Sequence, residues 1–267
     1  MTDKNEPLFN AGAAVYDSFT FLCPPAELTA AKAKLLPGQK VLDIACGSGW
    51  ATMAAARIVG ENGHVTGIDI ADKLLGVARQ KAASSGFVTI DYREGNVHNL
   101  DFKDGSFDAV ICASSLFLFS DIPRALHESC RVLKTGGTMV FSTFGKNVFQ
   151  PVMEMINDWM ARHPENMFPP SVISTTDSPE KCREIFARAG YENVKIAEET
   201  CVIHFPDKEK CWRQISGSLI VRPRLSVLAP DDYGILKQEI LSELERQVTP
   251  RKFSVDIPVI FSSVKNH

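Results

Sequence analysis

The sequence has no long apolar run. Nothing in its 267 residues approaches the ~20 consecutive apolar residues of a membrane span. The first residues, Met1 to Pro7, are polar and lack the apolar core of a signal peptide. We therefore expect no membrane span and a cytoplasmic location.

Metal-ligand spacings and an excess of one charge are also missing. None of the seven cysteines forms a C-x-x-C pair, and the six histidines show no H-x-x-x-H spacing. These absences favour reduced thiols and argue against a protein-bound metal. The formal net charge of −3 gives no electrostatic attraction for nucleic acid, so no nucleic-acid partner is expected.

What the sequence does have is a small-residue loop between an apolar run and a helix-forming stretch. Val41 and Leu42 lead through Asp43 into Ala45-Cys46-Gly47-Ser48-Gly49, and the alanine-rich residues 51–57 follow. This order predicts a strand, a tight loop and a helix. Because the loop glycines lack a Cβ, a ligand can approach the backbone closely, and free N–H groups at the helix start favour electron-rich groups. A nucleotide-like cofactor is the first hypothesis.

A second strand, predicted at residues 64–70, places a carboxylate where a ribose would be bound. Asp69 ends this strand, 20 residues after Gly49. A carboxylate at this point of a β-α-β unit commonly accepts hydrogen bonds from ribose hydroxyls. The structural alternative is an N-cap for the helix predicted at 72–84, and Asp72 suits that cap better.

Apolar strands and helices continue to alternate through the first half of the chain. Strands are predicted at 87–92 and 107–113, followed by a helix capped by Asp121, a turn at 134–137 and a strand at 138–144. Such alternation predicts an α/β fold, a Rossmann-like doubly wound, mostly parallel sheet. Gly47, Asp69, Asn96 and Ala113 all fall at carboxyl ends of strands, where ligands bind in these sheets.

The second half is less regular. We expect helices at 148–160, 178–190, 207–220 and 230–248, a loop at 164–170, and strands at 191–197 and 254–264. The economical interpretation is a single domain over 1–267. Its parts would be an N-terminal helical cap (1–37), a cofactor-binding core (38–145), substrate-side helices with the sixth strand (146–250) and a final strand (251–267).

The type of cofactor follows from the residue at position 52. A G-x-G-x-x-G dinucleotide loop would have glycine or alanine where this chain has Thr52. This difference argues against a nicotinamide cofactor.

The chain resembles the class I S-adenosylmethionine-dependent methyltransferases, and among them the small-molecule branch that includes the ubiquinone/menaquinone C-methyltransferases. The matching segments keep the family order: Val41 to Gly49, Gly67 to Asp69, Gly95 to Phe102, Phe107 to Val110 and Arg131 to Gly137.

The resemblance implies S-adenosyl-L-methionine as cofactor and a role for ten residues. Gly47, Ser48 and Gly49 would lie under the methionine part, with Ala113 beside it. Asp69 would bind the ribose, Ile70 would pack on adenine, and Asn96 and Val97 would contact the adenine edge, with the Asn96 carbonyl accepting from the exocyclic amine. Tyr16 would close the site from the N-terminal side. Ala45 replaces the commoner first glycine, and Asn96 stands where many relatives have Asp.

Methyl transfer from a sulfonium is an in-line displacement that depends mainly on alignment and desolvation. A base is needed only if the acceptor must shed a proton. His98, His204 and Tyr16 are candidates, but a surface or capping role suits each, and no catalytic residue is assigned. Aromatic and methionine side chains suggest a small apolar or aromatic acceptor, although most aromatic residues simply belong to a core. They are Phe19, Phe21, Phe117, Phe119, Phe144, Phe149, Met153, Trp159, Met160, Phe168 and Trp212.

Two alternatives remain at this point. One is a nicotinamide-dependent oxidoreductase, because Asp69 alone suits either cofactor. The other is a non-catalytic cofactor-binding protein, because no base is evident.

Overall fold

The computed structural model describes residues 6–164, 169–246 and 253–266. The chain divides into two compact units: residues 1–143, 178–198 and 260–267 form unit 1, and residues 144–177 and 199–259 form unit 2. The predicted loop at 164–170 with Phe168, and the predicted helix end at 248, lie partly or wholly outside the described residues. The expectation of a single domain with the boundaries given above stays a prediction.

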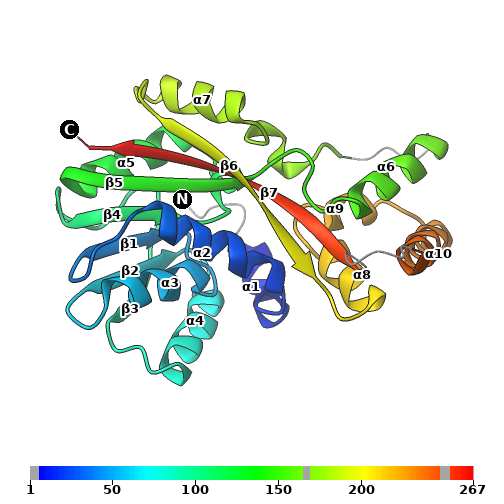
Figure 1. The fold of residues 1–267 in the computed structure, drawn as a ribbon, viewed down its shortest axis with the longest axis horizontal. Helices are drawn as coiled ribbons and strands as arrows, with labels where there is room; N and C mark the ends of the chain where they lie inside the picture. Colours follow the sequence, from blue (N-terminus) through cyan, green and yellow to red (C-terminus); the bar gives the residue numbers. More distant parts are fainter. Residues whose placement is uncertain (1–5, 165–168, 247–252, 267) are drawn as a thin grey trace. The chain divides into compact units, whose positions relative to one another are not determined.

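Unit 1 holds the alternating helices and strands that the sequence predicts (Figure 1). Its elements are α1 (Glu6–Tyr16), η1 (Thr20–Leu22), α2 (Cys23–Lys32), β1 (Lys40–Ile44), α3 (Trp50–Val59), β2 (His64–Asp69), α4 (Asp72–Ser84), β3 (Ile90–Glu94), β4 (Phe107–Cys112), η2 (Leu116–Leu118), α5 (Ile122–Val132) and α7 (Pro179–Arg188). Unit 2 holds α6 (Val152–Arg162), η3 (Val172–Thr175), α8 (Lys208–Ser216), α9 (Arg222–Leu225) and α10 (Pro230–Arg246). The remaining strands are β5 (Leu133–Phe144), β6 (Lys195–His204) and β7 (Ser254–Lys265).

The seven strands form one sheet in the order β3-β2-β1-β4-β5-β7-β6. The pairs β1–β2, β1–β4, β2–β3 and β4–β5 are parallel. β7 runs against β5, because Gly136 and Gly137 exchange backbone hydrogen bonds with Asn266 and Gly145 donates to the carbonyl of Pro258. The predicted mostly parallel, Rossmann-like sheet is confirmed.

Strand residues of unit 1 alternate between two helical layers. Val41, Ala109 and Val140 are fully or almost fully buried in a cluster with alanines of α2 and α3. Their neighbours, such as Leu42 and Val110, point to the other face and pack with residues of α5 and α7. Both faces of the sheet are therefore covered by helices, which is why its strands are almost continuously apolar.

Several boundaries differ from prediction. The predicted turn at 134–137 is wrong, because β5 begins at Leu133 and its first residues pair with Asn266. β6 starts later than predicted and runs to His204, where Phe205 donates to the carbonyl of Phe253 beside β7. β3 starts three residues after the predicted Phe87. No helix in the described part of the chain is long and apolar enough to cross a membrane.

Candidate functional site

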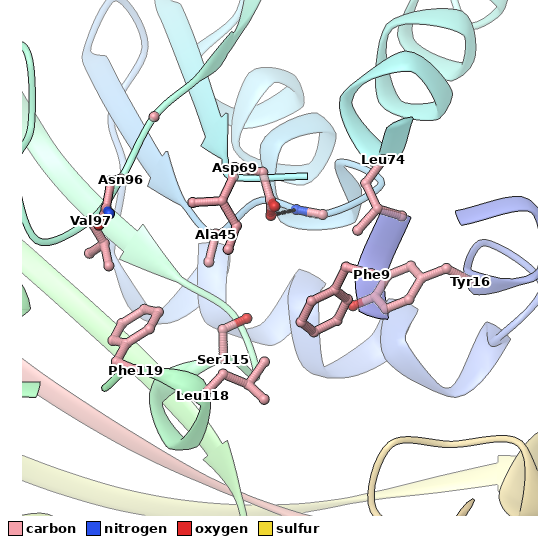
Figure 2. Close-up of a pocket in the computed structure, with 13 residues that line it drawn as sticks. Phe9, Tyr16, Ala45, Asp69, Leu74, Asn96, Val97, Ser115, Leu118 and Phe119 are labelled. Atoms are coloured by element: carbon pink, nitrogen blue, oxygen red, sulfur yellow. Dashed lines mark hydrogen bonds between the residues drawn. The ribbon is translucent and has the colours of Figure 1, made fainter. Parts of the chain in front are cut away.

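The carboxyl ends of β1 to β4 meet around two adjoining cavities in unit 1. The larger encloses about 580 Å³, part of it open to solvent, and is shown in Figure 2. The smaller encloses about 380 Å³ and lies against the start of α3. Tyr16 and Ala45 line both cavities, so the two form one continuous site.

Nine of the ten predicted cofactor-binding residues line these cavities. The larger is lined by Tyr16, Ala45, Gly47, Asp69, Ile70, Asn96 and Val97, among others. The smaller is lined by Tyr16, Ala45, Ser48 and Ala113, among others. Gly49 lines neither and occupies the position before α3. The arrangement brings the residues together, while the role of each stays a prediction.

Gly49 has a structural reason to be glycine. Its φ of 84° lies in the left-handed region, and a Cβ at this position would be 2.3 Å from the Tyr92 hydroxyl. Ala45 also has a positive φ, 54°, although it carries a Cβ. Because this conformation costs an L-residue about 1–2 kcal/mol, replacement of the usual first glycine by Ala45 leaves strain in the loop.

Asp69 connects the loop after β1 to the end of β2. Its Oδ2 accepts a hydrogen bond from the N–H of Gly47 at 2.8 Å, and its Oδ1 accepts from Ala71 at 2.9 Å. Burial raises the pKa of this carboxyl, and the backbone hydrogen bonds oppose the rise. The expectation that Asp72 caps α4 is wrong: α4 begins at Asp72, Ala71 precedes it without a side-chain cap, and Asp69 holds the N–H of Ala71.

Asp43 is a functional candidate to which the sequence analysis assigned no role. It is fully buried at the end of β1 and lines the smaller cavity. Thr52 donates its hydroxyl hydrogen to Oδ2 at 2.6 Å, whereas Oδ1 has no partner in the described part of the chain. Burial raises the pKa of Asp43 to about 7. Asp43 lines the cavity and carries an orphaned buried acceptor, which suits a ligand that brings a donor or a positive charge.

Asn96 is held by the residue two positions further on. Its Oδ1 accepts from the backbone N–H of His98 at 2.9 Å and lies 3.0 Å from Nδ1 of the same residue. Its backbone carbonyl accepts from Asn99 at 3.0 Å. The side-chain and backbone oxygens of Asn96 thus both accept hydrogen bonds within the chain. The expected hydrogen bond from the exocyclic amine would have to share one of them.

The two candidate histidines are engaged in hydrogen bonds. Nε2 of His98 accepts from the N–H of Asp121 at 3.3 Å, and Nδ1 of His204 lies 2.6 Å from the Ser254 hydroxyl. Burial raises the pKa of Tyr16, with a contribution from the charge of Asp69. The two histidines therefore position other groups.

The N-terminal helix contributes apolar side chains that sequence reasoning missed. Phe9 lines the larger cavity and packs edge-on against Tyr16, with ring centroids 6.0 Å apart (Figure 2).

Asp17, just after α1, forms an ion pair with Lys81 of α4. Lys81 also lies 3.4 Å from the Ser48 hydroxyl and 3.6 Å from the centroid of the Trp50 ring. No local pattern pairs α1 with α4, so these contacts had no signal in the sequence.

Leu118 and Phe119 line the same cavity as Asp69 and Asn96. The sequence analysis grouped Phe119 with residues that would hold an acceptor. Most other members of that group in unit 2 are core residues, such as Phe149, Trp159 and Trp212. No cluster of three His, Cys, Asp or Glu residues suited to a metal occurs among the residues that the structure describes.

A family model described as a methyltransferase domain matches residues 35–190. The chain belongs to this family. The match spans β1 to β5 and the cavity-lining residues after these strands, but not Phe9 and Tyr16, and it confirms the resemblance found in the sequence. It gives the nicotinamide-dependent alternative no support.

Relatives with similar sequences carry the name ubiquinone/menaquinone biosynthesis C-methyltransferase UbiE. The protein from Haemophilus ducreyi is 40% identical over 121 residues, which are 45% of this chain and 47% of that protein. The protein from Vibrio vulnificus is 40% identical over 120 residues, 45% of this chain and 46% of that protein. The chain therefore spans about half the length of the curated relatives it matches.

Solved structures share the fold of this methyltransferase domain. The YcgJ protein from Bacillus subtilis has a TM-score of 0.56 at 19% identity, covering 91% of this chain and 99% of that one. The phosphoethanolamine N-methyltransferase 2 of Haemonchus contortus, solved with phosphomonomethylethanolamine and S-adenosylhomocysteine, has a TM-score of 0.57 at 17% identity. That match covers 97% of this chain and 58% of the other.

Proposed function

We propose that this chain transfers a methyl group from S-adenosylmethionine to a small molecule. The observation that carries the proposal is the pair of adjoining cavities that share Tyr16 and Ala45. One cavity combines Asp69 and Asn96 with apolar side chains, which suits an adenosine. The other is lined by Asp43, whose Oδ1 has no partner among the residues that the structure describes, and this suits an ammonium group.

The residues present fit the two ends of this cofactor. Asp69 accepts from the N–H of Gly47 at Oδ2 and from the N–H of Ala71 at Oδ1, and its carboxylate keeps acceptor capacity for a ribose. Ile70 and Val97 supply apolar surface for a base. In the smaller cavity we assign Asp43, Ser48 and Ala113 to the amino-acid end, where a carboxylate and an ammonium group attract each other strongly in a buried setting.

S-adenosylmethionine supplies a methyl group on a positively charged sulfur, which is already activated for displacement. The chain then has to bind, align and exclude water. Phe9 and Tyr16 of α1 cover the larger cavity with aromatic surface and shield it from solvent. No residue is assigned as a catalytic base, because the nitrogens of His98 are engaged in hydrogen bonds.

We further propose that the acceptor is apolar or aromatic. Phe9, Leu74, Leu118 and Phe119 line the larger cavity, and their surface favours such a molecule. The names of the relatives, which refer to ubiquinone and menaquinone, support an aromatic ring as the methylated group.

Titration with S-adenosylhomocysteine and with NADH tests the cofactor. Trp50 lines the smaller cavity, so S-adenosylhomocysteine should change its fluorescence, and the change should disappear in Trp50→Phe. Trp159 and Trp212 are buried in unit 2 and serve as the constant background. Tight binding of NADH with no response to S-adenosylhomocysteine would refute the proposal.

Transfer of a radiolabelled methyl group tests the activity. The assay uses a panel of phenols, naphthols and prenylated aromatic compounds beside polar amines. We expect label in an aromatic product. Cofactor binding without turnover of any panel member would instead favour the non-catalytic alternative, and label only in polar amines would overturn the apolar acceptor.

A further inference from the structure

The orientation of the Asn96 carboxamide is fixed by the chain itself. The backbone N–H of His98 can only donate, so the Asn96 atom 2.9 Å away must be the oxygen, Oδ1. This removes the usual ambiguity between the two ends of an amide. Nδ2 is then the polar side-chain atom whose hydrogens have no partner among the residues that the structure describes, and Asn96 lines the larger cavity.

The ring of His98 adds a second donor to the same oxygen. The N–H of Asp121 lies 3.3 Å from Nε2, so Nε2 accepts and carries no hydrogen. The neutral ring must then carry its hydrogen on Nδ1, which donates to Oδ1 of Asn96 at 3.0 Å.

The start of α5 keeps this ring in place. Asp121 is the N-cap of α5 and accepts from the N–H of Arg124 at 3.0 Å, while the Arg124 side chain donates to the carbonyl of His98. The opposite side of the ring meets Phe119 edge-on at 6.1 Å, and Phe119 lines the cavity. His98 is thus fixed between a helix terminus and the wall of the site.

We propose that His98 is a positioning residue that makes Asn96 present a hydrogen-bond donor, not an acceptor, to the base of the cofactor. The inference rests on the proposed S-adenosylmethionine function. Adenine offers an acceptor at N1 and a donor at its exocyclic amine, whereas hypoxanthine offers an acceptor at O6 and a donor at N1. A carboxamide donor held against N1 meets an acceptor on adenine but an N–H on hypoxanthine, so this site rejects a 6-oxopurine.

A carboxylate at position 96 has the opposite preference. In the same place it can accept from the N1–H of hypoxanthine, but it meets the N1 of adenine with no hydrogen to share. Because an unmatched polar contact in a buried site lowers affinity by roughly one to two orders of magnitude, the residue at 96 decides how strictly adenine is selected.

Calorimetric titration with S-adenosylhomocysteine and S-inosylhomocysteine tests this. The native chain should bind S-adenosylhomocysteine at least about 10-fold more tightly than S-inosylhomocysteine. Asn96→Asp should lose or reverse this preference. Aspartate accepts both hydrogen bonds from His98, so the variant should keep its fold, which a melting curve checks. Asn99→Asp makes the same chemical change on an exposed neighbour and should leave the ratio unchanged.

A spectroscopic measurement isolates the role of His98. Nitrogen-15 NMR should show the Nδ1–H tautomer of His98 in the native chain, and Asn96→Ala should change the Nδ1 chemical shift by removing its hydrogen-bond acceptor while the N–H of Asp121 keeps the tautomer. An Nε2–H tautomer in the native chain, or an Nδ1 shift that Asn96→Ala leaves unchanged, would overturn the positioning role.

The outcomes separate this inference from the proposed function. If neither compound binds the native chain, the proposed cofactor is wrong. If S-adenosylhomocysteine binds but S-inosylhomocysteine is rejected equally by the native chain and Asn96→Asp, the cofactor stands and the donor-facing Asn96 is refuted.

Discussion

The buried carboxyl of Asp43 should leave a measurable pH dependence on the stability of the ligand-free protein. The side chain is fully buried, Thr52 satisfies one oxygen, and the other oxygen has no partner in the described structure. Replacement by asparagine keeps the shape and the acceptor for Thr52 but removes the charge. Asp43→Asn therefore isolates the cost of burying an ionised group.

The sign follows from the direction of the pKa shift. The pKa of Asp43 rises from 3.8 to about 7 on folding, so between these values the folded state holds a proton that the unfolded state has released. Stability is therefore lost as pH rises through this window and levels off above it. Each unit corresponds to about 1.4 kcal/mol, so the contribution of Asp43 should fall by about 2–3 kcal/mol between pH 5 and pH 8.

Urea denaturation of the native chain and of Asp43→Asn at pH 5, 6, 7 and 8 measures this contribution. The difference in unfolding free energy between the two proteins cancels the other titrating groups, including Asp69, whose pKa is also raised by burial. We expect the variant to gain stability relative to the native chain as pH rises. A difference that stays constant from pH 5 to pH 8 would refute a titrating Asp43.

Three further predictions follow from the site and its support. The affinity for S-adenosylhomocysteine should rise about 10-fold per pH unit as pH rises toward 7, because the ammonium group of this compound needs the ionised Asp43. Calorimetry should find no such pH dependence in Asp43→Asn. Gly49→Ala should destabilise the fold by about 1–3 kcal/mol more than Gly190→Ala. Both glycines have a similar positive φ, but a Cβ at 190 meets nothing within 4 Å; equal melting temperatures would contradict the clash with Tyr92. Arg131→Lys should lower the free energy of unfolding by about 1–2 kcal/mol in urea denaturation. The guanidinium donates to the carboxylates of Asp104 and Glu128 and to the carbonyls of Leu100 and Phe102, and lysine cannot reproduce this planar set of donors. An unchanged midpoint would show that the exposed part of this network contributes nothing.

The parts of the fold with local sequence signals were predicted well. The helix predicted at 72–84 is α4 with the same limits, and Asp121 caps α5 as expected, accepting from Arg124. Nine of the ten predicted binding residues line the cavities for a similar reason. The carboxyl ends of parallel strands meet at one edge, so a correct order of strands already brings their following loops together.

The parts that were missed depend on residues far apart in the chain. β5 begins at Leu133 because Leu133 pairs with Phe107 of β4, and Gly136 and Gly137 pair with Asn266, which lies far along the chain. α1 meets α4 through Phe9, Tyr16 and the ion pair of Asp17 with Lys81, and no periodicity in either helix predicts that contact. The unpartnered oxygen of Asp43 likewise appears only when side chains are placed in space.

Some hydrogen-bond donors and acceptors around the cavities are paired within the chain and others are not. The unpaired ones indicate which groups the ligand must supply. At the end of β1, one oxygen of Asp43 has no partner among the described residues, and a cation or a hydrogen-bond donor would satisfy it. At the end of β2, Asp69 accepts from backbone N–H groups and can still accept from a hydroxyl. After β3, the Asn96 side-chain oxygen accepts from His98, and its amide hydrogens have no partner in the part of the chain that the structure describes. A dinucleotide would bring an anionic pyrophosphate to the loop beside α3, where the Asp43 carboxylate would repel it. An adenosyl amino acid instead brings an ammonium group, ribose hydroxyls and a base acceptor, and this order of charges is the strongest physical argument for S-adenosylmethionine over a nicotinamide cofactor.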